Sequence, residues 1–306
     1  MAIDLSIRIG ALKLKNPVMV ASGTFGYSGE FSGFFDLKKL GAVVSKTVTI
    51  KPRQGNIPPR TCETPSGLIN SIGLENPGIE VFLEKKLPLL RKSGVPVIVS
   101  IASEETPQEL EILAKRLGKA PGVSALELNI SCPNVKKTRL ISQDPEATYA
   151  AVKLARRATV KPLITKLSPN VTDITEIALA AQEAGSDALA LINTVQAMSI
   201  DVRTRRPKIA MVTGGLSGPA IRPVAVRMVW EVCRKVKIPV IGMGGISDTG
   251  SALEFFLAGA SAVSVGTMNF VDPGISGEII KGIGEYLRKN KISSIKELIG
   301  ALECRI

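Results

Sequence analysis

Residues 161–194 read KPLITKLSPNVTDITEIALAAQEAGSDALALINT, with two short apolar runs on either side of a longer segment. The runs, Leu163 to Leu167 and Ala188 to Asn193, have the length and composition of buried strands. The segment between them has helical spacing and ends at Ala184-Gly185, and a left-handed glycine commonly terminates a helix. The stretch therefore predicts a strand, a crossover helix and a second, parallel strand.

The same alternation continues in both directions along the chain. Pro96, Pro162 and Pro239 each lead into a strand, where a missing N–H weakens the ladder least. Gly41 and Gly259 are further places where we predict a left-handed residue at the end of a helix. The predicted strands are Val18 to Ala21, Ala42 to Thr47, Val97 to Ile101, Ala125 to Ile130, Leu163 to Leu167, Ala188 to Asn193, Val240 to Met243 and Ala262 to Gly266. Eight βα units predict an α/β fold, the TIM (β/α)8 barrel.

The predicted barrel occupies the chain as one unit. With 306 residues and 45% apolar content the chain can bury a large core, and its composition shows no break that would mark a linker. We therefore expect a single domain over residues 1–306. Leu5 to Lys15 predict a short N-terminal β-hairpin through Gly10, which would close the bottom of the barrel.

Composition also excludes several classes of function. The chain has no histidine, which removes Ser-His-Asp hydrolases and HExxH metalloproteases. Its four cysteines are scattered, so no metal site is predicted. The net charge of +12 comes from basic residues spread along the chain with few aromatics, so we predict no nucleic-acid partner. No signal peptide and no apolar run of about 18 residues are present, and we expect a soluble cytoplasmic protein with no membrane attachment.

Polar or glycine residues follow every predicted strand, at the barrel end where enzymes of this fold place their chemistry. Lys46 and Lys166 suggest a buried anion or an electron-rich ring, although strand-end lysines can also reach solvent. The stretch from Thr213 to Gly218 precedes Pro219 and a helical segment, which predicts N–H groups and a helix N-terminus gathered into a phosphate site. Gly244-Gly245 after the seventh strand and Gly266-Thr267 after the eighth support a phosphorylated cofactor or substrate.

Four motifs carry a family resemblance: ASGTFG at 21–26, SKTVT at 45–49, NSIGLENPG at 70–78 and NISCPN at 129–134. Together they resemble class 1 dihydroorotate dehydrogenases, and the Gly-Thr-Phe-Gly form of the first motif is most similar to the class 1B catalytic subunit. The resemblance implies FMN-dependent oxidation of dihydroorotate to orotate in de novo pyrimidine (UMP) biosynthesis. It also implies a homodimer core that forms a heterotetramer with an electron-transfer subunit carrying FAD and a 2Fe-2S cluster. Electrons would then pass to NAD, and the sequence leaves fumarate and quinone open as acceptors.

The resemblance also implies site residues. FMN contacts are expected at Ser22, Lys46, Thr47, Ser100, Asn129, Lys166, Ile192, Gly218, Gly244, Gly245, Gly266 and Thr267. Substrate contacts are expected at Lys46, Asn70, Ser71, Ile72, Gly73, Leu74, Asn129, Asn134, Asn193 and Thr194. Two positions depart from the family pattern: Ser100 stands where asparagine usually faces FMN, and Glu75 stands where glutamine is common. The contact between Ser100 and FMN is therefore left open.

Cys132, Lys46 and Lys166 are the expected catalytic residues. A single cysteine is most often a small buried apolar residue. Cys132, however, follows a predicted strand in a basic setting with Lys136 and Arg139 nearby in sequence, which favours the thiolate. By the resemblance, this thiolate removes a proton from C5 of dihydroorotate, while Lys46 neutralises the orotate carboxylate and Lys166 stabilises charge at N1 of the reduced flavin.

Two other functions remain open from sequence. A flavin barrel that acts on RNA, such as a tRNA dihydrouridine synthase, also pairs a cysteine with lysines, although the chain leaves no room for its separate RNA-binding helical domain. A barrel without enzymatic activity, serving as a binding or scaffold subunit, is the other alternative. A gel shift with tRNA and a flavin absorption spectrum, respectively, distinguish them from the dehydrogenase.

Overall fold

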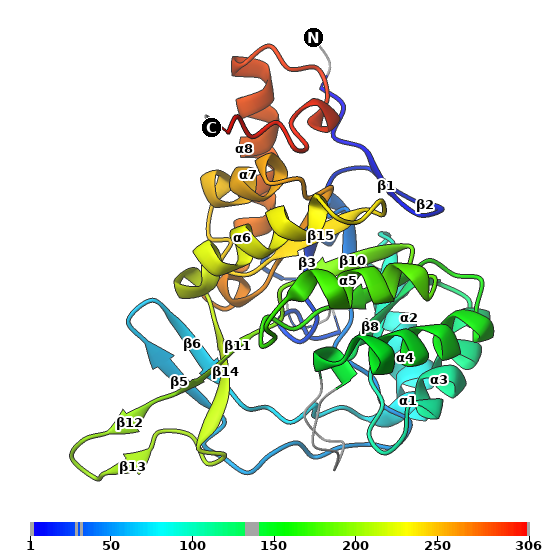
Figure 1. Cartoon of the computed structure of the whole chain (residues 1–306), viewed down its shortest axis with the longest axis vertical. Coiled ribbons are helices and arrows are strands. Elements are labelled where there is room, and N and C mark those ends of the chain that lie inside the picture. Colours follow the sequence, from blue (N-terminus) through cyan, green and yellow to red (C-terminus); the bar gives the residue numbers. More distant parts are fainter. Residues whose placement is uncertain (1–2, 28–29, 31–32, 132–140, 305–306) are drawn as a thin grey trace.

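The computed structural model describes residues 3–27, 30, 33–131 and 141–304 and forms a closed parallel barrel (Figure 1). The barrel strands are β3 (Val18–Val20), β4 (Ala42–Val44), β7 (Val97–Ile101), β8 (Val123–Asn129), β9 (Leu163–Lys166), β10 (Ala188–Leu191), β15 (Val240–Met243) and β16 (Ala262–Val265). Neighbours in the ring follow chain order, and β16 closes the ring on β3. The predicted TIM barrel and all eight of its strands are confirmed.

The strands read as apolar runs because both of their faces are covered. Every residue of β7 is buried, for example, with the barrel interior on one side and helices on the other. Longer helices surround the barrel and bury one stripe each, as α3 does with Leu110, Leu113, Ala114 and Leu117. These helices are α3 (Gln108–Lys119), α4 (Pro145–Ala158), α5 (Ile174–Glu183), α6 (Arg222–Cys233), α7 (Thr249–Leu257) and α8 (Ile275–Lys289).

Shorter helical turns complete the outer layer. Helix α1 (Gly78–Val81) continues through a π-helical turn at Phe82–Lys86 into α2 (Leu87–Arg91). Single 3-10 turns lie at Leu37–Lys39, Ile141–Gln143, Pro219–Ile221, Thr267–Phe270 and Ile295–Glu297. In the described part of the chain, no helix is both long and apolar enough to span a bilayer.

The glycines predicted to end helices have two different roles. Gly185 and Gly259 follow α5 and α7 with φ of +106° and +113°, as predicted for left-handed terminators. Gly41 does not have a positive φ, so its predicted role is wrong. A Cβ at Gly41 would lie 2.2 Å from the carbonyl oxygen of Asn16. Glycine is required at Gly41 because the backbone of Asn16 approaches closely, not because a left-handed residue follows the 3-10 turn at Leu37–Lys39.

The N-terminal hairpin lies at the bottom of the barrel, as predicted. It consists of β1 (Ile7–Ile9) and β2 (Leu12–Leu14), with Ile9 and Leu14 fully buried. Gly10 turns the hairpin with φ +55°, and a Cβ there would lie 3.0 Å from Cβ of Asp187, directly before β10. The hairpin therefore packs at the N-terminal ends of the barrel strands, opposite the predicted site.

Two further sheets extend from the other end of the barrel and were not predicted. An antiparallel sheet runs in the order β11 (Val195–Met198), β14 (Thr213–Ser217), β6 (Gly67–Asn70) and β5 (Thr61–Thr64). Between β11 and β14 the chain forms the small pair β12 (Ile200–Asp201) and β13 (Arg206–Pro207). Figure 1 shows this pair projecting away from the barrel as an arm. The four-stranded sheet joins the excursion after β4 to the excursion after β10.

Candidate active site

Hydroxyl and amide groups from neighbouring strands meet at Thr47, at the C-terminal end of the barrel. Thr47 follows β4 and is 5% exposed. Its Oγ1 lies 3.1 Å from Oγ of Ser22, which follows β3, and 3.0 Å from Oγ of Ser100 in β7. Asn129, the last residue of β8, donates its Nδ2 to the same oxygen at 3.4 Å. The fold thus brings together four of the residues that the sequence assigned to the cofactor. We call them the Thr47 cluster.

Two lysines lie beside this cluster. Lys166 ends β9 in register with Asn129 and is 6% exposed, and Lys46 immediately precedes Thr47 and is half-buried. Neither lysine forms an ion pair with a carboxylate of the residues described. A buried ammonium group is costly unless a negative or electron-rich group is near it. The mouth of the barrel is therefore suited to an anionic ligand.

The predicted glycines form a close-packed cradle at the other side of the mouth. Gly218, Gly244 and Gly245 all have positive φ, and Gly218 leads through a 3-10 turn into α6. A Cβ at Gly244 would lie 3.3 Å from Cγ1 of Ile192, and one at Gly218 would lie 3.7 Å from Cγ2 of Thr267. Among the predicted cofactor residues, Gly244 therefore lies beside Ile192 and Gly218 lies beside Thr267. Gly266 lies beside β3, with a Cβ placed 3.7 Å from Cβ of Ala21.

The phosphate loop predicted over Thr213 to Gly218 is only partly correct. Residues 213–217 form β14, an antiparallel strand paired on both sides, so their N–H groups are not gathered around a ligand. Only Gly218 lies at the start of the helical segment. At the same place Gly245 packs against Arg222, because a Cβ on it would lie 2.8 Å from the Arg222 nitrogen. The predicted helix N-terminus is present at α6. The glycines next to it, however, are Gly218 and Gly245, and not the whole stretch from Thr213 to Gly218.

Gly214 and Gly215 instead allow β14 to approach the predicted substrate residues. A Cβ at Gly215 would lie 2.0 Å from Oγ1 of Thr194, and one at Gly214 would lie 2.6 Å from the carbonyl oxygen of Asn70. Asn70 also donates its Nδ2 to the carbonyl of Gly215 at 3.3 Å. Asn70 and Thr194 therefore lie on either side of Gly215, although they are far apart in sequence.

The remaining predicted substrate residues that the structure describes lie in two short segments. Ser71, Ile72, Gly73 and Leu74 follow β6 and are half-buried, with φ of +76° at Gly73 and +55° at Leu74. Asn193 follows β10 and accepts a hydrogen bond from the Thr194 nitrogen at 2.8 Å. We call residues 70–74 the substrate loop.

Asn170 was not predicted, yet it fixes the second of these segments. It donates to the Thr194 carbonyl at 3.0 Å and accepts from the Gln196 nitrogen at 2.9 Å. The sequence signal for Asn170 was weak, because an asparagine after proline is equally typical of an ordinary turn.

Cys132 and Asn134 lie outside the described residues, so their predicted roles stay predictions. Other candidate proton acceptors can be compared. Burial raises the pKa of the Cys233 thiol to about 12, so it stays protonated near neutrality. Burial, and then the charges of Glu30 and Glu75, raise the pKa of Tyr27 above its usual range. Neither group is suited to act as a base near pH 7.

The residues present fit a flavin phosphate cofactor. Oδ1 of Asn129 is buried and has no hydrogen-bond partner within the described part of the chain, so it can accept from a ligand N–H. The glycine cradle at the start of α6 suits a phosphate, and Lys166 supplies a buried positive charge beside Asn129. By contrast, no group of three or more His, Cys, Asp or Glu side chains suited to a metal occurs among the residues described.

The comparisons with known proteins agree with this arrangement. Residues 4–287 match the family model described as dihydroorotate dehydrogenase. The chain is 54% identical over 300 residues to the "Dihydroorotate dehydrogenase B (NAD(+)), catalytic subunit" of Geotalea uraniireducens, with 98% of each chain covered. The proteins of that name from Geobacter sulfurreducens and Trichlorobacter lovleyi are each 55% identical to it, again with 98% of each chain covered. Given the barrel, the residues at its mouth and these matches, the chain belongs to the dihydroorotate dehydrogenase family.

Proposed function

We propose that this chain is the catalytic subunit of a class 1B dihydroorotate dehydrogenase, which oxidises dihydroorotate to orotate in de novo pyrimidine (UMP) biosynthesis. One observation carries the proposal: the Thr47 cluster and Lys166 share a barrel mouth with Asn70 and Thr194. The proposed cofactor residues and substrate residues are thus close together, and this supports the proposal because hydride transfer requires the two ligands to be adjacent. The names of these relatives, which specify a catalytic subunit, support the same assignment.

FMN is the proposed cofactor, and when bound it supplies the acceptor for a hydride from the substrate. Gly244 and Gly245, with Gly266 and Thr267, would hold its phosphate near the start of α6. Asn129 would accept a hydrogen bond from the flavin or the substrate through its unpaired Oδ1. Lys166 would stabilise negative charge at the flavin N1 position. We assign the whole chain, residues 1–306, to one FMN-binding domain.

Substrate recognition is assigned to amide and ammonium groups. Dihydroorotate has a ring edge of alternating N–H and C=O groups, and an asparagine amide offers both donors and an acceptor to such an edge. Asn70, Asn129 and Asn193 reach this edge in our proposal, with Asn134 as a further contact. Lys46 pairs with the substrate carboxylate. Cys132 takes the proton from C5.

The proposed partner is an electron-transfer subunit that carries FAD and a 2Fe-2S cluster. The relatives' names specify both NAD(+) and a catalytic subunit, which supports a second subunit that passes electrons to NAD. We propose a homodimer core and a heterotetramer with this partner, located in the cytosol.

The purified chain tests the proposal directly. We expect a yellow protein that releases FMN on denaturation and loses flavin absorbance when mixed anaerobically with dihydroorotate. A colourless chain that does not take up FMN would contradict the cofactor. A flavin that dihydroorotate leaves oxidised, but another dihydropyrimidine reduces, would contradict the substrate.

A further inference from the structure

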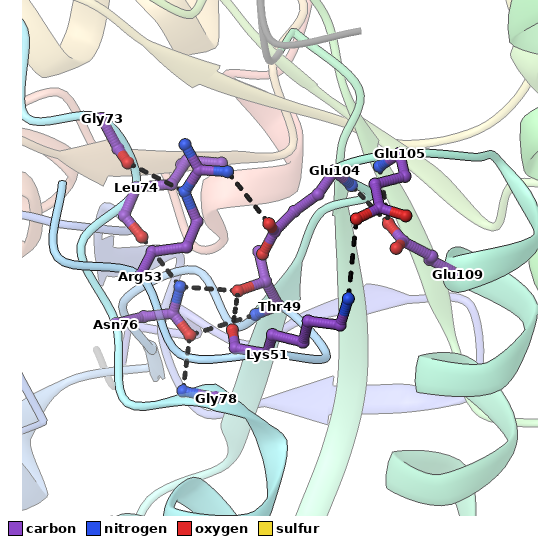
Figure 2. A network of polar contacts seen from close by, with 10 residues as sticks. All are labelled: Thr49, Lys51, Arg53, Gly73, Leu74, Asn76, Gly78, Glu104, Glu105 and Glu109. Carbon is purple, nitrogen blue, oxygen red and sulfur yellow. Dashed lines mark hydrogen bonds and ion pairs between the residues drawn. The ribbon is translucent and has the colours of Figure 1, made fainter. Parts of the chain in front are cut away.

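Asn76 lies just after the substrate loop and uses all of its hydrogen-bonding groups within the protein. It is 6% exposed. Its Oδ1 accepts from the backbone nitrogens of Thr49 at 3.2 Å and Gly78 at 2.9 Å. Its Nδ2 donates to Oγ1 of Thr49 and to the carbonyl of Leu74, both at 2.8 Å. Figure 2 shows this side chain between the segment that contains Thr49 and the turn at Leu74. A primary amide can make few further contacts, so Asn76 is committed to the fold.

The segment that contains Thr49 is anchored on the barrel. Val48 donates its backbone N–H to Ser100 and accepts from Ala102, so the chain after Lys46 continues alongside β7. Thr49 is fully buried there. Asn76 therefore ties the substrate loop to a segment whose position is fixed by the barrel.

The turn at Gly73 and Leu74 needs hydrogen bonds from other residues to keep its shape. Leu74 has φ of +55°, a left-handed conformation that a residue with a branched side chain rarely adopts. Its carbonyl is held by Nδ2 of Asn76 at 2.8 Å, and the adjacent Gly73 carbonyl accepts from Nε of Arg53 at 3.2 Å. In Figure 2 the side chain of Arg53 lies beside Gly73, and the amide of Asn76 lies below Leu74. The amide of Asn76 directly stabilises the shape of the turn.

We propose that Asn76 is a positioning residue for the substrate loop, which it holds in a binding-competent shape at the barrel mouth without touching the substrate. The inference rests on the proposed function, because the loop is a substrate site only if the chain binds dihydroorotate or orotate. A loop already in its bound shape loses less conformational freedom when the ligand binds. Loss of the Asn76 contacts should therefore weaken ligand binding and leave the cofactor in place.

The test compares three variants with the wild-type holoenzyme. Asn76→Ala removes all four contacts. Asn76→Asp keeps an acceptor for the Thr49 and Gly78 nitrogens but cannot donate to the Leu74 carbonyl. Asn16→Ala is the matched control: Asn16 is 5% exposed, donates to Lys39 and accepts from Val18, but it lies at the opposite end of the barrel. FMN content, orotate affinity from the flavin absorbance change, and hydrogen exchange of residues 66–78 are measured for each.

We expect Asn76→Ala to weaken orotate binding by about tenfold or more and to accelerate exchange across the substrate loop, with FMN content unchanged. Asn76→Asp should behave similarly, because the contact to Leu74 is lost in both. Asn16→Ala should change neither orotate affinity nor exchange in the loop. KM should rise more than kcat falls.

Two results would overturn the inference: wild-type orotate affinity and loop exchange in Asn76→Ala, or equal weakening in Asn16→Ala. If Asn76→Ala does not fold, Asn76→Asp decides by the same measurements. If the wild-type holoenzyme binds FMN but not orotate, the proposed function fails. Loop exchange would then still decide whether Asn76 fixes the shape of residues 70–74.

Discussion

Lys166 is buried at the end of β9 without a carboxylate partner among the described residues. Replacing it should therefore affect a negatively charged ligand bound beside it. We expect Lys166→Ala to lower the flavin midpoint potential, because negative charge on the reduced flavin loses its stabilising neighbour. Spectroelectrochemical titration measures the potential. Lys235→Ala, on the exposed turn after α6, is the control. An unchanged potential and an unchanged rate of flavin reduction would show that the Lys166 charge does not act on the flavin.

Cys132 is the second residue with a decisive test. We expect Cys132→Ala to slow flavin reduction by dihydroorotate by about 100-fold to 10,000-fold, because a general base is lost and the chain has no histidine to replace it. FMN and orotate should remain bound. Cys132→Ser should retain slight activity with its pH profile displaced upward, since a hydroxyl is the weaker acid.

Rapid anaerobic mixing separates this reductive step from reoxidation of the flavin. Reduction of the Cys132→Ala flavin at a rate within a few-fold of wild type would place the base elsewhere. Cys233 would be a poor substitute, because burial raises its pKa to about 12.

Helix α7 shows how a single cap stabilises an element next to the cradle. Oδ1 of Asp248 accepts from the Ser251 nitrogen at 2.7 Å, and Ser251 Oγ accepts from the Asp248 nitrogen at 2.9 Å. We expect Asp248→Ala to lower the free energy of unfolding by about 1 kcal/mol. Asp248→Asn, which keeps an acceptor, should lose less. Urea denaturation of the three proteins at pH 7 measures the difference.

The same cap should depend on pH. Its hydrogen bonds, chiefly to the Ser251 backbone, lower the pKa of Asp248 in the folded state. A lowered pKa means that the carboxylate stabilises the fold above the unfolded-state pKa and that this contribution disappears as pH falls through the folded-state value. The stability difference between wild type and Asp248→Ala should therefore shrink in acid. A difference that stays constant down to about pH 2 would contradict this assignment.

The elements that could be predicted from sequence were those buried on both faces. The barrel strands give continuous apolar runs, and α3 and its neighbours give a helical stripe, so local pattern was enough. Strand β5, with the sequence Thr-Cys-Glu-Thr, is exposed or half-buried throughout and carries no such signal. Its sheet forms because β6 pairs with β14 at a great distance along the chain, through contacts such as Asn70 with Gly215. Local pattern cannot report that pairing.

The site was predicted largely through motifs, and the errors have a common physical origin. The residues of the Thr47 cluster were assigned from the family resemblance, and they lie at strand ends, positions that the barrel brings together. Gly41, Gly214 and Gly215 were misinterpreted because a glycine indicates a special backbone need without identifying it. In these three cases the need is space for a neighbouring segment, which only the folded chain reveals.

At the scale of the whole molecule, the isolated chain should reduce its flavin but should not pass the electrons on to NAD unless a partner subunit is added. We expect the isolated holoenzyme to lose flavin absorbance with dihydroorotate but to reduce NAD at no measurable rate. The sequence contains neither a GxGxxG fingerprint after a predicted strand nor a cysteine cluster for an iron–sulfur centre. Steady-state assays with NAD, fumarate and quinone, before and after addition of the co-purified partner, measure this. Robust NAD reduction by the chain alone would contradict it.

Strands β16 and β3 close the ring, and at the bottom of the barrel the N-terminal and C-terminal segments also pair with each other. Asp4 forms a parallel bridge with Ser294, and its backbone nitrogen donates to the Ser293 carbonyl at 2.9 Å. Figure 1 shows the N- and C-terminal segments together on the same side of the molecule. The two segments are therefore close enough to be joined, which would allow the chain to begin and end elsewhere. A circular permutant joined across this junction and reopened at the exposed turn between α3 and β8, around Pro121, would keep every strand pairing of the ring.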